Sequence, residues 1–143
     1  MKCLVYVLKT LRMPRESKIV AAQRESRWVV KWHPRAWEEV QAIEDAQERV
    51  AIAHAIEKLQ IDGPALRSPH QSGVMGEGGA GLRELRPRRG RSRWRPLYRR
   101  IEQHLFAILV VGPEAEIDKG GYERAVRIAS RRLRQIEERS KRK

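Results

Sequence analysis

An uninterrupted apolar run from Leu105 to Val111 constrains the fold of this chain more than any other feature of its sequence. Continuous apolar strands are typical of the interior of a sheet, where both faces are covered. The run therefore predicts a central β-strand. Gly112-Pro113 follows at once and is expected to end it.

Two further strand candidates come just before this run, from Gly81 to Arg86 and from Ser92 to Ile101. Their connections are short, so the three strands are expected to form hairpins. An earlier β-prone run, from Trp28 to Trp32, stops at His33-Pro34. Proline is favoured as the first residue of a helix, so this strand is expected to lead directly into one.

Two helices are expected after His33-Pro34, and a third at the end of the chain. Asp45 with Glu48 resembles a capping box between the first two helices, and Asp62-Gly63-Pro64 is a strong stop signal. The pair is therefore interpreted as an αα-hairpin. The final helix has an apolar face and an arginine face, formed respectively by Tyr122, Val126, Ala129, Leu133 and Ile136 and by Arg124, Arg127, Arg131 and Arg134.

The predicted fold is α+β: an N-terminal strand, an αα-hairpin, a three-stranded antiparallel meander and a C-terminal helix. The expected domain covers residues 27–138, with a basic tail at 139–143. Residues 1–26 are interpreted as an extension, which could pack as an extra strand, stay disordered, or reflect an upstream start codon with Met13 as the internal alternative. The segment from Asp62 to Gly81 is expected to be a mobile loop.

The charge of the chain predicts a polyanionic partner, with nucleic acid as the leading candidate. There are 31 Lys+Arg against 18 Asp+Glu, which gives a formal net charge of +13. Arginine dominates the strand region, and its planar donor fork suits phosphate and unpaired bases. Glu84 is the only acid within this group, whose arginines are Arg83, Arg86, Arg88, Arg89, Arg91, Arg93, Arg95, Arg99 and Arg100.

Two aromatic residues, Trp94 and Tyr98, are interleaved with these arginines and are expected to share one face of their strand. They could offer stacking surfaces to bases, or they could belong to the core while the arginines are merely solvated. His70, in the predicted loop, is a further candidate for contact with RNA. His54 is interpreted as a helix residue without a catalytic role.

Several functional classes are disfavoured by the residues present. Cys3 is the only cysteine, which excludes an intramolecular disulfide and fits a reducing cytoplasm. The apolar run from Cys3 to Leu8 is too short to span a membrane. The glycine-rich stretch before Gly81 lacks the Gly-Lys-Ser/Thr sequence that ends a P-loop. No serine lies in the Gly-x-Ser-x-Gly motif of a hydrolase nucleophile. The histidines are too scattered to suggest a metal site, so neither metal nor cofactor is expected.

Three segments together resemble the RelE/HigB toxins: Leu82-Arg83-Glu84-Leu85-Arg86, then Trp94-Arg95-Pro96-Leu97-Tyr98, then the apolar strand. The resemblance covers residues 27–136 and is greatest to the phage-derived HigB-type branch. It implies a toxin of a type II toxin–antitoxin system that cleaves mRNA on the ribosome without metal, by attack of the 2′-hydroxyl on the adjacent phosphate. It also implies a helix-turn-helix, HigA-like antitoxin as partner.

The same resemblance implies a catalytic set. Arg86 and Arg95 correspond to arginines that stabilise the scissile phosphate, and Tyr122 corresponds to a tyrosine near the start of the last helix. Tyr122 can supply a hydrogen bond or a proton transfer if neighbouring arginines depress its pKa. The charge pattern, and not the resemblance, predicts the RNA contacts, which are His70 and the arginines Arg83, Arg88, Arg89, Arg91, Arg93 and Arg99.

One departure from the family pattern follows the apolar strand. Many relatives carry a Lys or Arg pair there, whereas this chain has Glu114 and Glu116. Lys119 and Arg124 are the candidates to occupy the space of that missing Lys or Arg pair. The acidic stretch favours an alternative, a ParE-like toxin that inhibits DNA gyrase, and a non-catalytic nucleic-acid-binding phage protein is a third possibility.

Overall fold

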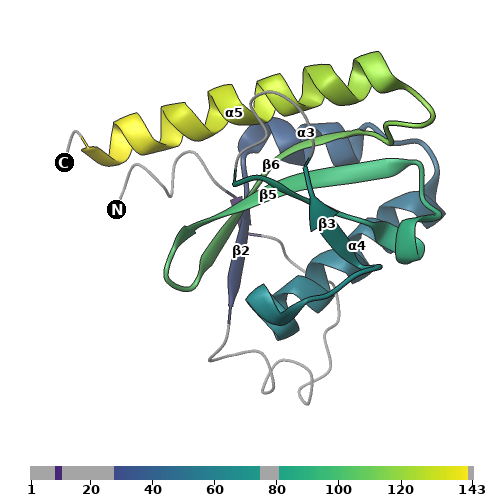
Figure 1. The fold of residues 1–143 in the computed structure, drawn as a ribbon, viewed down its shortest axis with the longest axis horizontal. Helices are drawn as coiled ribbons and strands as arrows, with labels where there is room; N and C mark the ends of the chain where they lie inside the picture. The colour runs from purple at the N-terminus through teal and green to yellow at the C-terminus, as the bar shows by residue number, and fades with distance from the viewer. Residues whose placement is uncertain (1–8, 11–27, 75–80, 142–143) are drawn as a thin grey trace.

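The computed structural model describes residues 9–10, 28–74 and 81–141. Within these ranges it has one mixed sheet of six strands in the order β1-β2-β6-β5-β4-β3, together with three α-helices (Figure 1). The strands are β1 (Lys9–Thr10), β2 (Val29–Trp32), β3 (Gln71–Gly73), β4 (Arg83–Leu85), β5 (Trp94–Glu102) and β6 (Leu105–Pro113). The helices are α3 (Pro34–Gln41), α4 (Ala46–Asp62) and α5 (Lys119–Lys141), with short 3-10 turns η1 (Gly63–Ala65) and η2 (Pro87–Gly90).

The predicted central strand is confirmed. β6 is buried from Leu105 to Val111 and lies between β5 and β2. β5 and β6 are joined through Gln103 and His104 alone, which makes them antiparallel neighbours, and β4 pairs antiparallel with β5. The predicted meander is therefore present.

The antiparallel pattern of the meander does not extend to the N-terminal strand. β2 runs parallel to β6, with Val29 opposite Leu105 and Trp32 opposite Ile108. A parallel pair needs a long connection between its strands, and the chain between β2 and β6 contains α3, α4 and the rest of the meander. The αα-hairpin thus lies within a crossover, which a list of predicted elements does not reveal.

The sheet separates two apolar clusters. One lies under α5 and includes Leu97, Leu109 and Leu133; the other lies under α3 and α4 and includes Trp32, Ile56 and Ile108. Figure 1 shows α5 running along one side of the sheet and α4 lying away from it, on the other side. Residues of β6 contribute to both clusters, which explains why its sequence is apolar throughout.

The helix starts follow the predicted signals with one exception. His33 caps α3, since its Nδ1 accepts from the Arg35 backbone N–H at 3.1 Å, and Asp45 caps α4 by accepting from the Gln47 N–H at 2.9 Å. Glu48 does not complete a capping box. Its carboxylate instead accepts a hydrogen bond from the Ser92 hydroxyl and pairs with Arg88.

Two short strands complete the sheet; β3 was not predicted, and β1 agrees with the extra strand that was one alternative for the N-terminal extension. β3 lies within the segment expected to be a loop and pairs with β4, while β1 pairs with β2 and is the described part of the N-terminal extension. The other residues of 1–26, and the glycines at 76, 78 and 79, lie outside the described residues. α5 continues through Lys141, so the described part of the predicted tail is helical. No helix in the described ranges is long and apolar enough to cross a membrane.

Candidate active site

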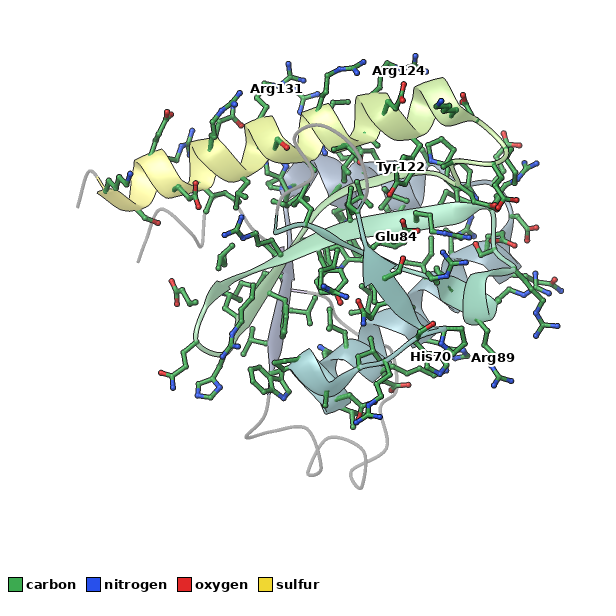
Figure 2. All side chains as sticks on the ribbon, viewed as in Figure 1. His70, Glu84, Arg89, Tyr122, Arg124 and Arg131 are labelled. Atoms are coloured by element: carbon green, nitrogen blue, oxygen red, sulfur yellow. The ribbon has the colours of Figure 1, made fainter. Side chains whose placement is uncertain are left out.

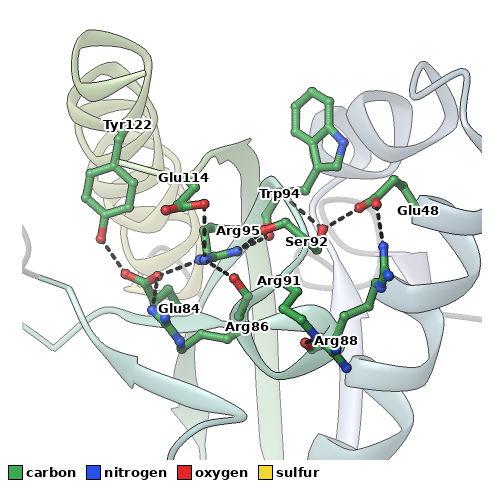
Figure 3. A network of polar contacts seen from close by, with 11 residues as sticks. Glu48, Glu84, Arg86, Arg88, Arg91, Ser92, Trp94, Arg95, Glu114 and Tyr122 are labelled. Atoms are coloured by element: carbon green, nitrogen blue, oxygen red, sulfur yellow. Dashed lines mark hydrogen bonds and ion pairs between the residues drawn. The ribbon is translucent and has the colours of Figure 1, made fainter. Parts of the chain in front are cut away.

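Glu84 is the centre of a polar network that brings the predicted catalytic residues together. Its Oε1 accepts a hydrogen bond from the Tyr122 hydroxyl at 2.7 Å. Its Oε2 lies 3.1 Å from Arg95 Nε and 3.5 Å from Arg86 Nη1 (Figure 3). The three residues come from β5, from the end of β4 and from α5, and one carboxylate joins them.

Arg95 is a buried residue whose guanidinium is occupied by protein atoms. It is 1% exposed, and it donates to the backbone carbonyls of Ser92 at 2.6 Å, Trp94 at 3.0 Å and Gly90 at 3.0 Å. Glu114 Oε2 lies 3.6 Å from its Nη2. Arg95 therefore holds η2 against β5, and the acidic residue that departs from the family pattern is one of its ion-pair partners.

Tyr122 is also in the interior, at 7% exposure. Burial raises the pKa of its phenol well above the usual value, and the hydrogen bond to Glu84 and the charge of that carboxylate raise it further. Arg95 and Arg86 lower the pKa, but their effect is the smaller one. The pKa of Tyr122 is therefore not depressed by the neighbouring arginines, because burial and the Glu84 carboxylate outweigh them.

Arg86 is the member of this network that reaches solvent, since 34% of its side chain is exposed. It follows β4 directly and packs against Gly90, where an added Cβ would lie 2.8 Å from Arg86 Nη2. Gly90 also has a φ of +94°, a conformation that favours glycine. The position of Arg86 thus depends on the shape of η2.

η2 presents arginines from an unusual backbone. Arg88 and Arg89 have φ values of +57° and +59°, which residues other than glycine rarely adopt. Arg88 pairs with Glu48 at 3.4 Å, and Arg91 Nε donates to the Arg88 carbonyl at 3.3 Å. Strained backbone of this kind persists where its surroundings fix it and is frequent at functional sites.

A cavity of about 500 Å³ lies between α4 and η2, and Arg86 is in its wall. Arg88, His54, Lys58 and His70 line it as well. His70 Nδ1 lies 3.4 Å from Lys58 Nζ. Burial lowers the pKa of His70, with smaller contributions from the charges of Lys58 and Arg89. Figure 2 shows His70 and Arg89 together on the side of the molecule away from α5.

Most of the predicted RNA contacts line one of three hollows. Arg88 lines the cavity beside α4, Arg91 and Arg93 line a groove with Glu39, Glu44, Asp45 and Glu48, and Arg83 and Arg99 line a third groove beside Tyr98. The acids of the second groove come from α3, from the turn between α3 and α4, and from the first turn of α4. The arginine face of α5 is separate again: Figure 2 shows Arg124 and Arg131 projecting from the outer side of the helix.

Three further predictions concern single residues. Tyr98 is 3% exposed and packs edge-on against Phe106, so it belongs to the core and offers no stacking surface. Trp94 is half-buried against the cluster under α3 and α4. Lys119 begins α5 as an exposed residue and takes no part in the described contacts of the network. Within the described ranges, no group of three or more His, Cys, Asp or Glu could hold a metal ion.

Sequence reasoning missed Glu84 and Lys58. Glu84 had a signal, because it is the single acid among the clustered arginines and such a residue is a natural ion-pair partner. Lys58 lies four residues after His54 on α4, which puts both on one helix face. Their proximity to His70 depends on how α4 packs, which local sequence does not encode.

Comparison with known proteins gives one family. The family model described as "Phage derived protein Gp49-like (DUF891)" matches residues 39–134, which is more than half of the chain and includes every residue of the Glu84 network. Searches of curated proteins and of solved structures gave no significant match. The chain therefore belongs to the Gp49-like family of phage-derived proteins, a RelE-like family of toxin-like proteins.

Proposed function

We propose that this protein is the toxin of a type II toxin–antitoxin pair, of the HigB-like branch, and that it cleaves mRNA on the ribosome. The observation that carries the proposal is the placement of Arg86. Its guanidinium is partly exposed beside an arginine-bearing turn, and it is anchored from behind by Glu84. Membership of a RelE-like family supports the same activity.

In the proposed reaction the RNA 2′-hydroxyl gives its proton to water and its oxygen attacks the adjacent phosphorus. The bond from phosphorus to the 5′-oxygen breaks, and that oxygen takes a proton from water, which produces a cyclic phosphate and a 5′-hydroxyl. Negative charge accumulates on the phosphorus oxygens in the transition state. A fixed guanidinium stabilises that charge more than it stabilises the ground state. Arg86 is the proposed contact to the phosphate. Arg95 and Tyr122 are proposed as positioning residues, since they act on Arg86 through Glu84.

The test is to add purified protein to translating ribosomes and to map the mRNA ends. We expect cuts at codon positions that are absent when translation is blocked. Arg86→Ala is expected to lower the cleavage rate by about 10²-fold, by comparison with the loss of one oxyanion donor. Arg131→Ala, an exposed arginine on α5, is the matched control and is expected to cleave at the parental rate.

An antitoxin partner belongs to the same proposal. Expression of this chain alone is expected to arrest bacterial growth, and co-expression of a neighbouring helix-turn-helix protein is expected to relieve the arrest. Normal growth with soluble, folded protein would contradict both the toxin and the partner.

The second candidate is a ParE-like toxin that inhibits DNA gyrase. The burial of Arg95 and Tyr122 favours it, because a toxin that only binds its target has no need of reachable catalytic groups. Gyrase-dependent DNA breaks with intact mRNA would support this candidate. A nucleic-acid-binding protein without either activity would give neither result.

A further inference from the structure

The cavity between α4 and η2 has the size and the chemistry of a nucleotide site. Its volume of about 500 Å³ falls within the usual range for small-molecule pockets. One wall is helix α4, and the other is formed by His70 and the chain from Arg86 to Arg88. Two separate segments of the chain therefore border it.

The charged groups of the cavity are mostly cationic. Lys58, Arg86 and Arg88 line it, together with two imidazoles, and Glu57 is the acid in the wall. Arginine and lysine side chains that converge in this way favour phosphate groups. The remaining lining includes Val50, Ala51, Ala55 and Pro87, which supply an apolar surface suited to the face of a base.

We infer that this cavity binds one nucleotide of a single RNA strand, with its phosphate held by Lys58 and Arg88 and its base against the apolar wall of α4. The nucleotide would be the neighbour of the one whose phosphate meets Arg86. The inference rests on the proposed function for its choice of RNA, and it adds a substrate subsite that the predicted catalytic set does not contain.

His70 fits the polar edge of such a subsite. The groups that act on its charge are Lys58 and Arg89, which disfavour protonation, and Asp62, which favours it. Together with burial these groups lower the pKa of His70, which favours the neutral form of the ring. A neutral imidazole both donates and accepts a hydrogen bond, which matches the polar edge of a base or a ribose hydroxyl.

Histidine NMR signals of the full-length protein test the inference directly. The chain has four histidines, of which His54 and His70 line the cavity and His33 and His104 do not. The probe is an RNA trinucleotide with 2′-O-methyl groups, which cannot be cleaved by 2′-oxygen attack. We expect saturable shifts at His54 and His70 without change at His33 and His104.

The matched variants are Lys58→Gln in the cavity and Lys141→Gln at the exposed end of α5. Lys58→Gln is expected to weaken trinucleotide binding about tenfold, as for loss of one charge-assisted hydrogen bond. Lys141→Gln is expected to bind as the parent does. An unchanged amide spectrum away from the cavity would establish that each variant is folded.

Two results would overturn the inference: shifts confined to residues outside the cavity, or pyrophosphate binding as tightly as the trinucleotide, which would make the cavity a simple anion site. The measurement needs no cleavage, so the two proposals can fail separately. Trinucleotide binding with intact ribosomal mRNA would contradict the nuclease alone. Cleaved mRNA without cavity shifts would contradict the subsite alone.

Discussion

Glu84→Ala is the substitution whose effect on stability can be worked out most fully from the structure. The change removes the carboxylate that joins Tyr122, Arg95 and Arg86. Arg95 is left 1% exposed without its closest anion, and the Tyr122 hydroxyl loses its acceptor. Both groups were desolvated on folding and can recover little hydration in the folded state.

The expected loss is large. Removing one partner of a buried ion pair costs about 3–5 kcal/mol. The pair with Arg86 adds little, because 34% of that side chain is exposed and water screens it. Glu84→Gln keeps an acceptor for Tyr122 and is expected to cost less than Glu84→Ala.

Urea unfolding, followed by tryptophan fluorescence, measures these differences. Glu102→Ala, at an exposed position on β5, is the control and is expected to change the free energy of unfolding by no more than about 0.5 kcal/mol. Tyr122→Phe combined with Glu84→Ala is expected to cost less than the sum of the two single changes. A loss below about 1 kcal/mol for Glu84→Ala would refute the reasoning, since so small a cost does not fit a broken buried ion pair.

Three further predictions concern stability. Gly63→Ala is expected to cost about 2 kcal/mol or more in urea unfolding, because Gly63 has a φ of +54° and an added Cβ would lie 2.3 Å from the Trp28 indole; Gly73→Ala, with nothing within 4 Å, is the control and should be nearly neutral. Burial lowers the pKa of His33 to about 4, so on acidification the unfolded chain binds a proton at this residue before the folded chain does, and stability falls as pH drops from 6.5 towards 4. The fall should be smaller in His33→Asn, which keeps a capping side chain, and an equal fall would contradict the assignment of this pH dependence to His33. Burial raises the pKa of Tyr98 to about 12, so the stability that the neutral phenol contributes is present below pH 10 and is lost as pH rises through 12. Tyr98→Phe should reduce the fall in the free energy of unfolding at alkaline pH, and an unchanged fall would contradict the assignment to Tyr98.

Most helices and strands of this fold could be predicted from local sequence, but β3 could not, and the pairing of the strands could be predicted only in part. The uninterrupted apolar run predicted β6. His33-Pro34 and Asp45 predicted the starts of two helices and Gly63 the end of one, because capping depends on residues that are close in sequence. The parallel β2–β6 pair and β3 depend on contacts between distant segments. Local sequence does not indicate which strand β2 will pair with. It does not predict β3 either, since Gln71, Ser72 and Gly73 show no β-prone pattern.

The sequence predicted which residues form the candidate site better than it predicted their burial and their pKa values. The order of the three sequence motifs predicted Arg86, Arg95 and Tyr122 as site residues. In the structure all three contact Glu84. The burial of Arg95 could not be read from the sequence, because β5 is buried continuously from Arg95 to Tyr98 and not at alternate positions. Tyr122 was expected on the apolar face of its helix, but its contact with Glu84 depends on how α5 packs. The direction of the Tyr122 pKa shift followed from the burial of Tyr122 and from that contact.

The most direct test of the proposed activity is the chemistry of the mRNA ends left on ribosomes. Attack by the 2′-oxygen predicts an upstream fragment that ends in a cyclic or 3′-phosphate and a downstream fragment that begins with a 5′-hydroxyl. Both fragments should depend on translation, and Arg86→Ala should reduce them about 10²-fold while Arg131→Ala leaves them unchanged. Intact mRNA on arrested ribosomes, or cleavage that Arg86→Ala does not slow, would contradict the account.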